Sequence, residues 1–222
     1  MKIEEIKIDS KEYPDKLKNI YDSPSKIYAL GNKKLLKQKA IAIVGTRKAT
    51  QYGKKIAYEF SKKLAQRGIN IISGLALGID SYAHLGCIQA QGEKYVGKTI
   101  AVMGSGFNNI YPKENIELAR KIIKSGGCII TEYTAKTKPE KLNFPQRNRI
   151  ISGLAEGILV VEANKKSGAL ITAEFALEQG KEVFTIPGDI TKEQSKGCNE
   201  LIKDGATLIT NYQEILTTTF SM

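Results

Sequence analysis

The segment from Lys141 to Leu154, KLNFPQRNRIISGL, has the residue types of a nucleic-acid contact. It places Phe144 among cations, because Lys141 precedes the ring and Arg147 and Arg149 follow it. An aromatic face can stack on a base while ammonium and guanidinium groups hold the phosphates on either side. The pattern therefore favours a site for a base flanked by phosphates.

The residue after the ring, Pro145, affects how the ring is presented. We expect it to restrict Phe144 to extended backbone and to keep the next helix from beginning before Gln146. The ring would then stand at the mouth of that helix. The alternative is that Phe144 packs against the helix start and that the arginines are solvated.

Several short apolar runs end in residues that suit phosphate. Glycines let backbone N–H groups approach an anion, a helix N-terminus adds partial positive charge, and Arg47 can hold a phosphate through two hydrogen bonds. The alternative is that glycine-rich turns merely end strands, as they do in many folds. We favour a phosphate site because several such segments occur: Gly45-Thr46-Arg47, Ser73-Gly74, Gly104-Ser105-Gly106 and Pro187-Gly188.

The sequence holds few candidates for catalysis. Its single histidine, His84, follows Asp80 by one helical turn, and we expect a structural contact instead of a catalytic pair. Glu162 and Glu174 are carboxylates that could cleave a bond near a phosphate, but glutamates are common on helix surfaces. We therefore predict that no residue is catalytic.

Cofactor and metal motifs are missing from the sequence. The first predicted strand is followed by GTRKAT instead of Gly-x-Gly-x-x-Gly, and no Gly-x-x-x-x-Gly-Lys-Ser/Thr loop occurs, so neither NAD nor ATP is supported. Cys87, Cys128 and Cys198 are far apart and lack the spacing of zinc ligands. We predict no cofactor, no metal and no disulfide.

The composition points to a polyanionic partner. Lys and Arg number 34 against 23 Asp and Glu, which gives a net charge of +11. A generally basic proteome would produce the same excess without any partner. The sequence has no apolar run long enough to span a membrane and no signal-peptide core at its start, so we expect a cytoplasmic protein without membrane contact.

From residue 39 onward, short β-rich runs alternate with amphipathic helical segments. Near-continuous apolar strands separated by helices are typical of a parallel sheet that is covered on both faces. We therefore predict an α/β fold with a doubly wound, mostly parallel sheet, and glycine C-caps at Gly68, Gly92, Gly126 and Gly180. The predicted strands are Ala40–Val44, Ile69–Ile72, Thr99–Met103, Cys128–Thr131, Ile158–Val161, Glu182–Ile186 and Ala206–Ile209.

Residues 1–38 lack a sustained period and are interrupted by turn signals such as Tyr13-Pro14 and Ser23-Pro24. We interpret them as an extension packed on the core, and residues 39–222 as the main domain. In such a sheet ligands bind beyond the carboxyl ends of the strands, so the segments that follow the strands decide function.

These motifs occur in an order and spacing that resemble the DNA-processing protein A family, also called Smf. The resemblance extends from about Tyr13 to Leu216. It rests on GTR at 45–47, SGLALGID at 73–80, IYP at 110–112, NFPQRNRIISGL at 143–154, VEA at 161–163, Ser167 to Ala173, Val183 to Gly188 and GCN at 197–199.

The resemblance implies an extended Rossmann-like domain that binds single-stranded DNA without sequence preference, forms homodimers and loads the RecA recombinase during natural transformation. It implies that Arg47 holds a backbone phosphate, that Ser73 and Gly74 line the pocket, that Lys141 contacts the strand and that Phe144 faces a base. Arg147 and Arg149 belong to the same motif, and the resemblance does not decide which of them points outward.

Two questions stay open at this level. Many family members carry an additional small domain, and few residues here follow the last predicted helix, Asn211–Leu216. The apolar N-terminal half of that helix and the Leu201-Ile202 segment are candidates for a dimer face. Ordinary core packing explains these residues as well. Two alternative functions are a nucleotide phosphoribohydrolase-like enzyme, in which Glu174 would act, and a nucleotide sensor. Enzymes of that kind carry a Pro-Gly-Gly-x-Gly-Thr loop, and this sequence has SGALIT at 167–172 instead.

Overall fold

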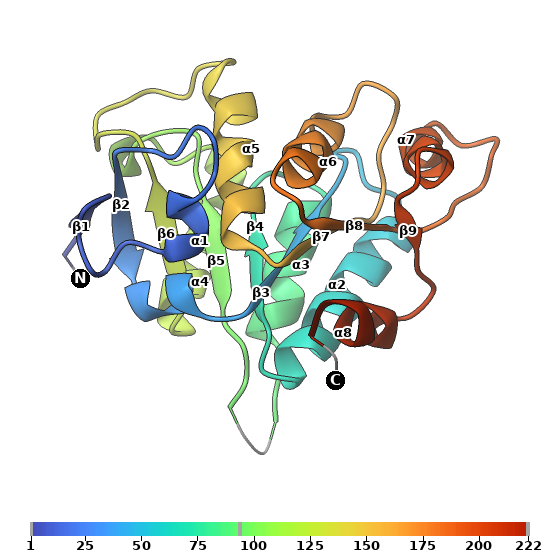
Figure 1. The fold of residues 1–222 in the computed structure, drawn as a ribbon, viewed down its shortest axis with the longest axis horizontal. Helices are drawn as coiled ribbons and strands as arrows, with labels where there is room; N and C mark the ends of the chain where they lie inside the picture. The colour runs from blue at the N-terminus through green and yellow to red at the C-terminus, as the bar shows by residue number, and fades with distance from the viewer. Residues whose placement is uncertain (1, 93–94, 221–222) are drawn as a thin grey trace.

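The computed structural model describes residues 2–92 and 95–220. Within this part of the chain, nine strands form one sheet in the order β1-β2-β6-β5-β4-β3-β7-β8-β9 (Figure 1). The strands are β1 (Glu4–Lys7), β2 (Lys26–Gly31), β3 (Ala40–Val44), β4 (Asn70–Ser73), β5 (Thr99–Val102), β6 (Cys128–Thr131), β7 (Gly157–Val160), β8 (Glu182–Thr185) and β9 (Thr207–Leu208).

The strands from β3 to β9 run parallel, and β1 and β2 add an antiparallel edge next to β6. Each of the seven predicted strands is present within one residue at either end. The strand order reverses between β3 and β7, because β4, β5 and β6 lie on one side of β3 while β7, β8 and β9 lie on the other. The prediction of a doubly wound, mostly parallel sheet is confirmed.

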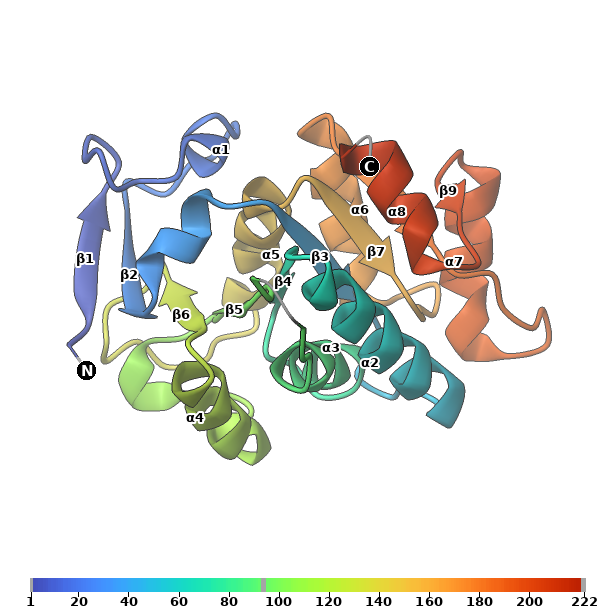
Figure 2. The ribbon, with the colours of Figure 1, turned by 90° about the horizontal axis from the view of Figure 1, so that it is seen from below.

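Helices cover both faces of the sheet (Figures 1 and 2). One face carries α1, α5, α6 and α7, and the other carries α2, α3, α4 and α8. The helices are α1 (Asp15–Lys18), α2 (Gln51–Gln66), α3 (Ile79–Ile88), α4 (Ile116–Lys124), α5 (Asn143–Leu154), α6 (Gly168–Glu178), α7 (Glu193–Lys203) and α8 (Tyr212–Phe220), with short 3-10 turns η1 (Lys33–Lys37), η2 (Phe107–Asn109) and η3 (Lys113–Asn115).

The sequence of β3, AIAIV, shows why a central strand is apolar on both sides. Ala40, Ala42 and Val44 face the core under α5 and α6, whereas Ile41 and Ile43 face the core under α2 and α3. Alternate side chains of a strand point to opposite faces, so a strand covered by helices on both sides needs apolar residues at every position. All five residues of β3 are buried.

Residues 1–38 contribute β1 and β2 to the same sheet, which the sequence did not lead us to expect. Tyr13, Leu17 and Ile27 from this segment are buried in the core shared with α5. The hydroxyl of Tyr13 donates to the carbonyl of Pro24 at 2.6 Å, which satisfies the buried phenol. The sheet therefore continues across residue 38, and the division of the chain at that residue stays a prediction.

Three of the four predicted glycine C-caps are present. Gly68, Gly126 and Gly180 follow α2, α4 and α6 with φ values of +81°, +82° and +66°. Only glycine adopts this left-handed backbone at little cost. Gly92 does not take this role, because α3 already ends at Ile88 and its C-cap is Gln89. None of the described helices is both long and apolar enough to cross a membrane.

Candidate nucleic-acid interface

A cleft of about 640 Å³ opens where the strand order reverses. The loop after β3 forms one wall, and the loop after β7 with the start of α6 forms the other. The first turns of α5 also line it. A doubly wound sheet binds its ligands at this position because the two central loops diverge to opposite faces. The side chains most relevant to binding are Arg47, Lys48, Tyr111, Lys141, Phe144, Lys166, Ser167 and Thr172.

The structure brings Arg47, Lys141 and Phe144 together from segments about 100 residues apart in sequence, as predicted. Arg47 and Lys141 are exposed, and Phe144 is half-buried. The guanidinium carbon of Arg47 lies 5.6 Å from the centroid of the Phe144 ring, within the range of a cation–π contact. One wall of the cleft thus combines an aromatic ring with two solvated cations.

The expected backbone at Phe144 is wrong. Helix α5 begins at Asn143 instead of Gln146, so that Phe144 lies in its first turn and is helical. Pro145 is tolerated there because the first N–H groups of a helix have no intrahelical acceptor. The ring still faces the cleft, since it projects from the first turn of a helix whose N-terminal end lines that cleft.

Arg147 is not an exposed DNA contact. Only 5% of the residue is accessible, and its guanidinium donates to the carbonyls of Gly74, at 2.7 Å, and Val102. Burial lowers the pKa of Arg147 to about 10, while Asp80 acts in the opposite direction. The residue belongs to the cleft lining, but its guanidinium is used by these carbonyls and joins α5 to the ends of β4 and β5.

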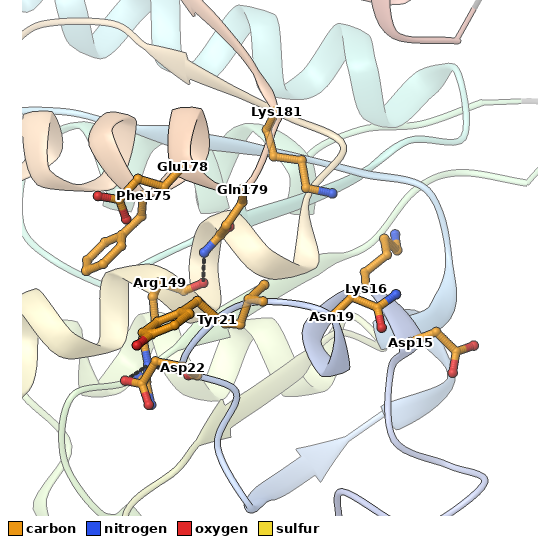
Figure 3. A pocket seen from close by; sticks show the side chains of 11 residues that line it. Asp15, Lys16, Asn19, Tyr21, Asp22, Arg149, Phe175, Glu178, Gln179 and Lys181 are labelled. Atoms are coloured by element: carbon orange, nitrogen blue, oxygen red, sulfur yellow. Dashed lines mark hydrogen bonds and ion pairs between the residues drawn. The ribbon is translucent and has the colours of Figure 1, made fainter.

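Arg149 lies outside the cleft. Its guanidinium forms ion pairs with Glu132, at 2.7 Å, and Asp22, at 2.8 Å. It borders a separate pocket of about 420 Å³ between α1, α5 and the end of α6, where it lies near Tyr21, Phe175 and Gln179 (Figure 3). Arginines two positions apart point to different sides of a helix, which is why Arg147 and Arg149 diverge. Neither is a free cation for phosphate.

Ser73 and Gly74 support the cleft from behind instead of lining it. Ser73 is fully buried, and its hydroxyl donates to the carbonyl of Ile43 at 2.7 Å. The N–H of Gly74 donates to the carboxylate of Asp80 at 3.0 Å, and its carbonyl accepts from Arg147. Their polar groups are therefore already used within the protein.

Gly45 and Thr46 line the cleft, as predicted for the first loop. The backbone of Thr46 is not free for an anion, because its N–H donates to the carbonyl of Glu162 at 2.7 Å. A Cβ at Gly45 would stand 2.5 Å from the Ile79 side chain, so glycine allows close packing of α3 here. The loop offers a ligand the side chains of Arg47 and Lys48 rather than a ring of N–H groups.

The turn Gly104-Ser105-Gly106 does not line the cleft. The N–H of Gly106 donates to the carbonyl of Thr137 at 2.9 Å. The hydroxyl of Ser105 donates to the backbone carbonyl of Asn109 at 2.7 Å. Gly104 instead touches Phe144, since a Cβ there would lie 2.9 Å from the Phe144 ring. The turn is a support for the aromatic ring.

Pro187-Gly188 is also absent from the cleft lining. The N–H and carbonyl of Gly188 both bind the side-chain amide of Asn199, at 3.1 and 2.9 Å. The segment thus joins the end of β8 to α7, away from the cleft.

The acidic residues and the histidine have structural partners. The carboxylate of Glu162 accepts from the N–H and hydroxyl of Thr50, which is the N-cap of α2. Asp80 accepts from Gly74 and Ala76 rather than contacting His84 as expected. His84 is fully buried with Nδ1 2.6 Å from the Thr99 hydroxyl, and burial lowers its pKa to about 3.

Sequence reasoning missed the second wall of the cleft. Lys166 is exposed, and Ser167 caps α6 by accepting from the N–H of Ala169 at 3.3 Å. The predicted binding segments omitted the loop after β7, although it lies opposite the loop after β3 at the reversal of strand order. Its Lys-Lys-Ser-Gly sequence before an apolar helix is the signal that would have identified it.

The fold and the site define a Rossmann-like protein with a basic, aromatic cleft at the switch point of its sheet. Among described residues no cluster of three His, Cys, Asp or Glu side chains could hold a metal ion. Residues 4–220 match the family described as DNA recombination-mediator protein A. The chain belongs to this family.

Relatives and solved structures agree with that membership. DNA processing protein DprA of Bacillus subtilis is 46% identical over 214 residues, which cover 96% of this chain and 70% of the relative. The X-ray structure of DNA processing protein A from Streptococcus pneumoniae is 40% identical and superposes with a TM-score of 0.91 over 99% of this chain and 75% of that one.

A structure of DNA processing protein A from Helicobacter pylori, which concerns that protein's single-stranded DNA binding mode, is 30% identical. It superposes with a TM-score of 0.85 over 98% of this chain and 96% of that one. The chain spans between 49% and 70% of the length of the curated relatives that it matches. The recognised resemblance and the Rossmann-like fold are therefore confirmed.

Proposed function

We propose that the chain binds single-stranded DNA in the cleft at the switch point, without sequence preference, as part of DNA processing in recombination and natural transformation. The observation that supports this most directly is the convergence of Arg47, Lys141 and Phe144 on one cleft. Cations neutralise phosphates of any sequence, and a phenyl ring stacks on any base. The single-stranded DNA binding mode described for the Helicobacter pylori relative agrees with this assignment.

Single strands suit this cleft better than duplex. A base reaches the half-buried Phe144 only if it is unpaired and splayed from its neighbours, whereas a duplex offers only phosphates to the cations. Fluorescence anisotropy with labelled single and double strands of equal length, repeated over a series of salt concentrations, tests this. We expect tighter binding of the single strand at each salt concentration. Equal affinity would mean that charge alone drives binding.

We infer from the family description that the bound strand is passed to the RecA recombinase. The test is the rate at which the recombinase hydrolyses ATP on a single strand, with and without this protein. We expect ATP hydrolysis to begin sooner when the wild-type chain is present. A cleft variant that has lost DNA binding should not shorten this delay. No change with the wild-type chain would contradict recombinase loading while leaving DNA binding intact.

We further infer a homodimer, and the structure narrows its candidate face. Ile215 and Leu216 of α8 are buried against α2 in the chain's own core, so these two residues are not exposed for a dimer contact. Leu201 and Ile202 on α7 stay half-buried, and Leu208 on the edge strand β9 is 43% exposed. Leu208→Asp should convert a dimer to a monomer in analytical ultracentrifugation. A wild-type chain that sediments as a monomer would contradict the proposal.

The protein acts, in this proposal, without catalytic turnover. Glu174, the carboxylate that a phosphoribohydrolase-like enzyme would use, is exposed on α6 and is not among the residues that line the cleft. Incubation with nucleoside monophosphates and labelled oligonucleotides should leave both intact. Product formation that disappears in Glu174→Gln would favour the enzyme. Tight binding of a free nucleotide that single strands do not displace would favour a sensor.

A further inference from the structure

The ring of Tyr111 stands beside Phe144 in the cleft wall and is 43% exposed. Their centroids are 5.5 Å apart, and the ring planes are inclined by 49°. Tyr111 comes from the loop between η2 and η3, whereas Phe144 comes from α5. A loop and a helix thus bring two aromatic rings to the same wall.

The two rings are too close to hold one base between them. A base sandwiched by two rings needs roughly 7 Å between the ring centroids, twice the ordinary contact distance of carbon atoms. The observed 5.5 Å is shorter, and the rings are tilted rather than parallel. Each ring can therefore stack on a base of its own, and the tilt would keep two successive bases splayed apart.

Arg47 controls access to one of the rings. Its guanidinium lies over Phe144, and the backbone at Gly104 touches the same ring. Gly104 belongs to a buried turn, whereas Arg47 is exposed and long. A base can approach the Phe144 face when Arg47 moves from the ring to a phosphate, which leaves Tyr111 as the ring that is open beforehand.

The loop that carries Tyr111 is fixed on both sides. Before the ring, the side-chain amide of Asn109 donates to the carbonyl of Lys136 at 3.0 Å. After it, the amide of Asn115 donates to the carbonyl of Leu75 at 2.8 Å. A ring held in place before binding loses little conformational entropy when a base stacks on it. The loop is therefore built to present the tyrosine, in contrast to a surface side chain that moves freely.

We propose that Tyr111 forms a second base-binding subsite, so that the cleft holds two successive bases of a single strand, one on Tyr111 and one on Phe144. The inference rests on the proposed function of the cleft and adds a ligand contact to it. The phenol hydroxyl is not required, because stacking uses only the ring face.

The lack of tryptophan in the chain allows a direct test. Tyr111→Trp introduces a single indole at the subsite, and stacking on a base should quench its fluorescence. We expect saturable quenching by a short thymidine oligonucleotide and none by an abasic oligonucleotide with the same number of phosphates. Tyr21→Trp, at a fully exposed tyrosine beside the separate pocket of Figure 3, is the matched control and should not respond.

Affinity measurements distinguish two subsites from one. Tyr111→Ala should weaken single-strand binding about 5- to 150-fold without changing its salt dependence, and Tyr111→Phe should bind like the wild type. In Tyr111→Ala/Phe144→Ala the loss should exceed that of either single variant, because separate bases are lost; it need not equal their product, since the two rings are in contact. If the double variant loses no more than either single one, the rings share one base and the proposal is overturned.

Failure of this proposal is separable from failure of the proposed function. If Phe144→Ala weakens binding while Tyr111→Ala and Tyr21→Ala both bind like the wild type, the cleft binds single strands but Tyr111 is not a subsite. If the wild-type chain shows no preference for single strands, the function itself is wrong. Melting temperatures close to the wild type in Tyr111→Ala exclude unfolding as the cause of a loss.

Discussion

The guanidinium of Arg147 donates to the carbonyl oxygen of Gly74 across 2.7 Å and thereby joins α5 to the end of β4. Asp80 accepts from the N–H of the same glycine at 3.0 Å. A Cβ at Gly74 would lie 2.6 Å from the Arg147 guanidinium and 2.8 Å from the Asp80 carboxylate, so only glycine fits between them. These buried groups hold the helix whose first turn presents Phe144.

Arg147→Ala should therefore act on stability before it acts on binding. Removal of the guanidinium leaves the buried Asp80 carboxylate without the cation that opposes its desolvation, and we expect a loss of about 3 to 5 kcal/mol in the free energy of unfolding. Urea denaturation measures this loss. Arg120→Ala is the control, because Arg120 is exposed on α4 and its replacement should change stability by less than about 0.5 kcal/mol.

The pH dependence of Arg147→Ala provides a second check. Burial raises the pKa of Asp80 above its ordinary value, and Arg147 opposes that rise. A carboxyl with a raised folded-state pKa binds its proton more tightly when folded, so stability falls as pH rises through that pKa. Without Arg147 the pKa rises further, and the variant should be more destabilised at neutral pH than at acid pH. In the double variant Arg147→Ala/Asp80→Asn, stability should no longer depend on pH in this way, because the titrating carboxyl is gone. If the pH dependence persists in the double variant, it does not come from Asp80.

Stability at acid pH should depend on His84 with the opposite sign. Burial lowers its pKa from 6.5 to about 3, with Arg147 adding to the effect, so the folded protein binds the proton less tightly than the unfolded chain. The stability from neutral His84 is fully present above pH 6.5 and is lost as pH falls towards 3. Denaturation of wild type and His84→Gln at several pH values isolates this contribution. A constant difference between the two proteins across this range would contradict it.

Sequence periodicity predicted the sheet well because burial on both faces requires apolar residues throughout each strand, as in β3. It did not reveal β1 and β2, because short strands of four and six residues with mixed polarity, such as Glu4–Lys7, lack that pattern. The sheet edge is formed by tertiary pairing with β6.

The candidate site was predicted unevenly for a physical reason. Arg47 and Lys141 could be found because charged side chains are unsuited to a core, and Phe144 could be found because it lies among cations in the sequence. The sequence could not show that Arg147 is buried, since that depends on the carbonyl groups of Gly74, just after β4, and Val102, at the end of β5, which accept its hydrogen bonds. Gly104 was wrongly predicted to line a phosphate pocket. A glycine is needed there because a side chain would collide with the Phe144 ring.

Arg47 and Lys141 should contribute to DNA binding through charge. If each neutralises one phosphate of a single strand, Arg47→Ala or Lys141→Ala should reduce the slope of log affinity against log salt concentration by about 0.7, equally for all sequences. Anisotropy titrations at four or more salt concentrations give the slopes. Arg120→Ala and Lys121→Ala, exposed cations on α4, are matched controls for total charge. Equal slopes in cleft and control variants would show that no specific phosphate is held in the cleft.

Phe144→Ala should weaken binding without changing the salt slope. The ring carries no charge, so no counterion release is lost, but a stacked base is worth on the order of 1 to 3 kcal/mol. Folding should be little affected because the ring is half-buried at the cleft and touches Arg47, Tyr111 and Gly104 rather than the main core. Anisotropy titration measures the binding loss and thermal denaturation is its control. A variant that melts far below the wild type but binds single strands normally at low temperature would instead make Phe144 a packing residue at the start of α5, and the base contact would then lie on another part of the cleft.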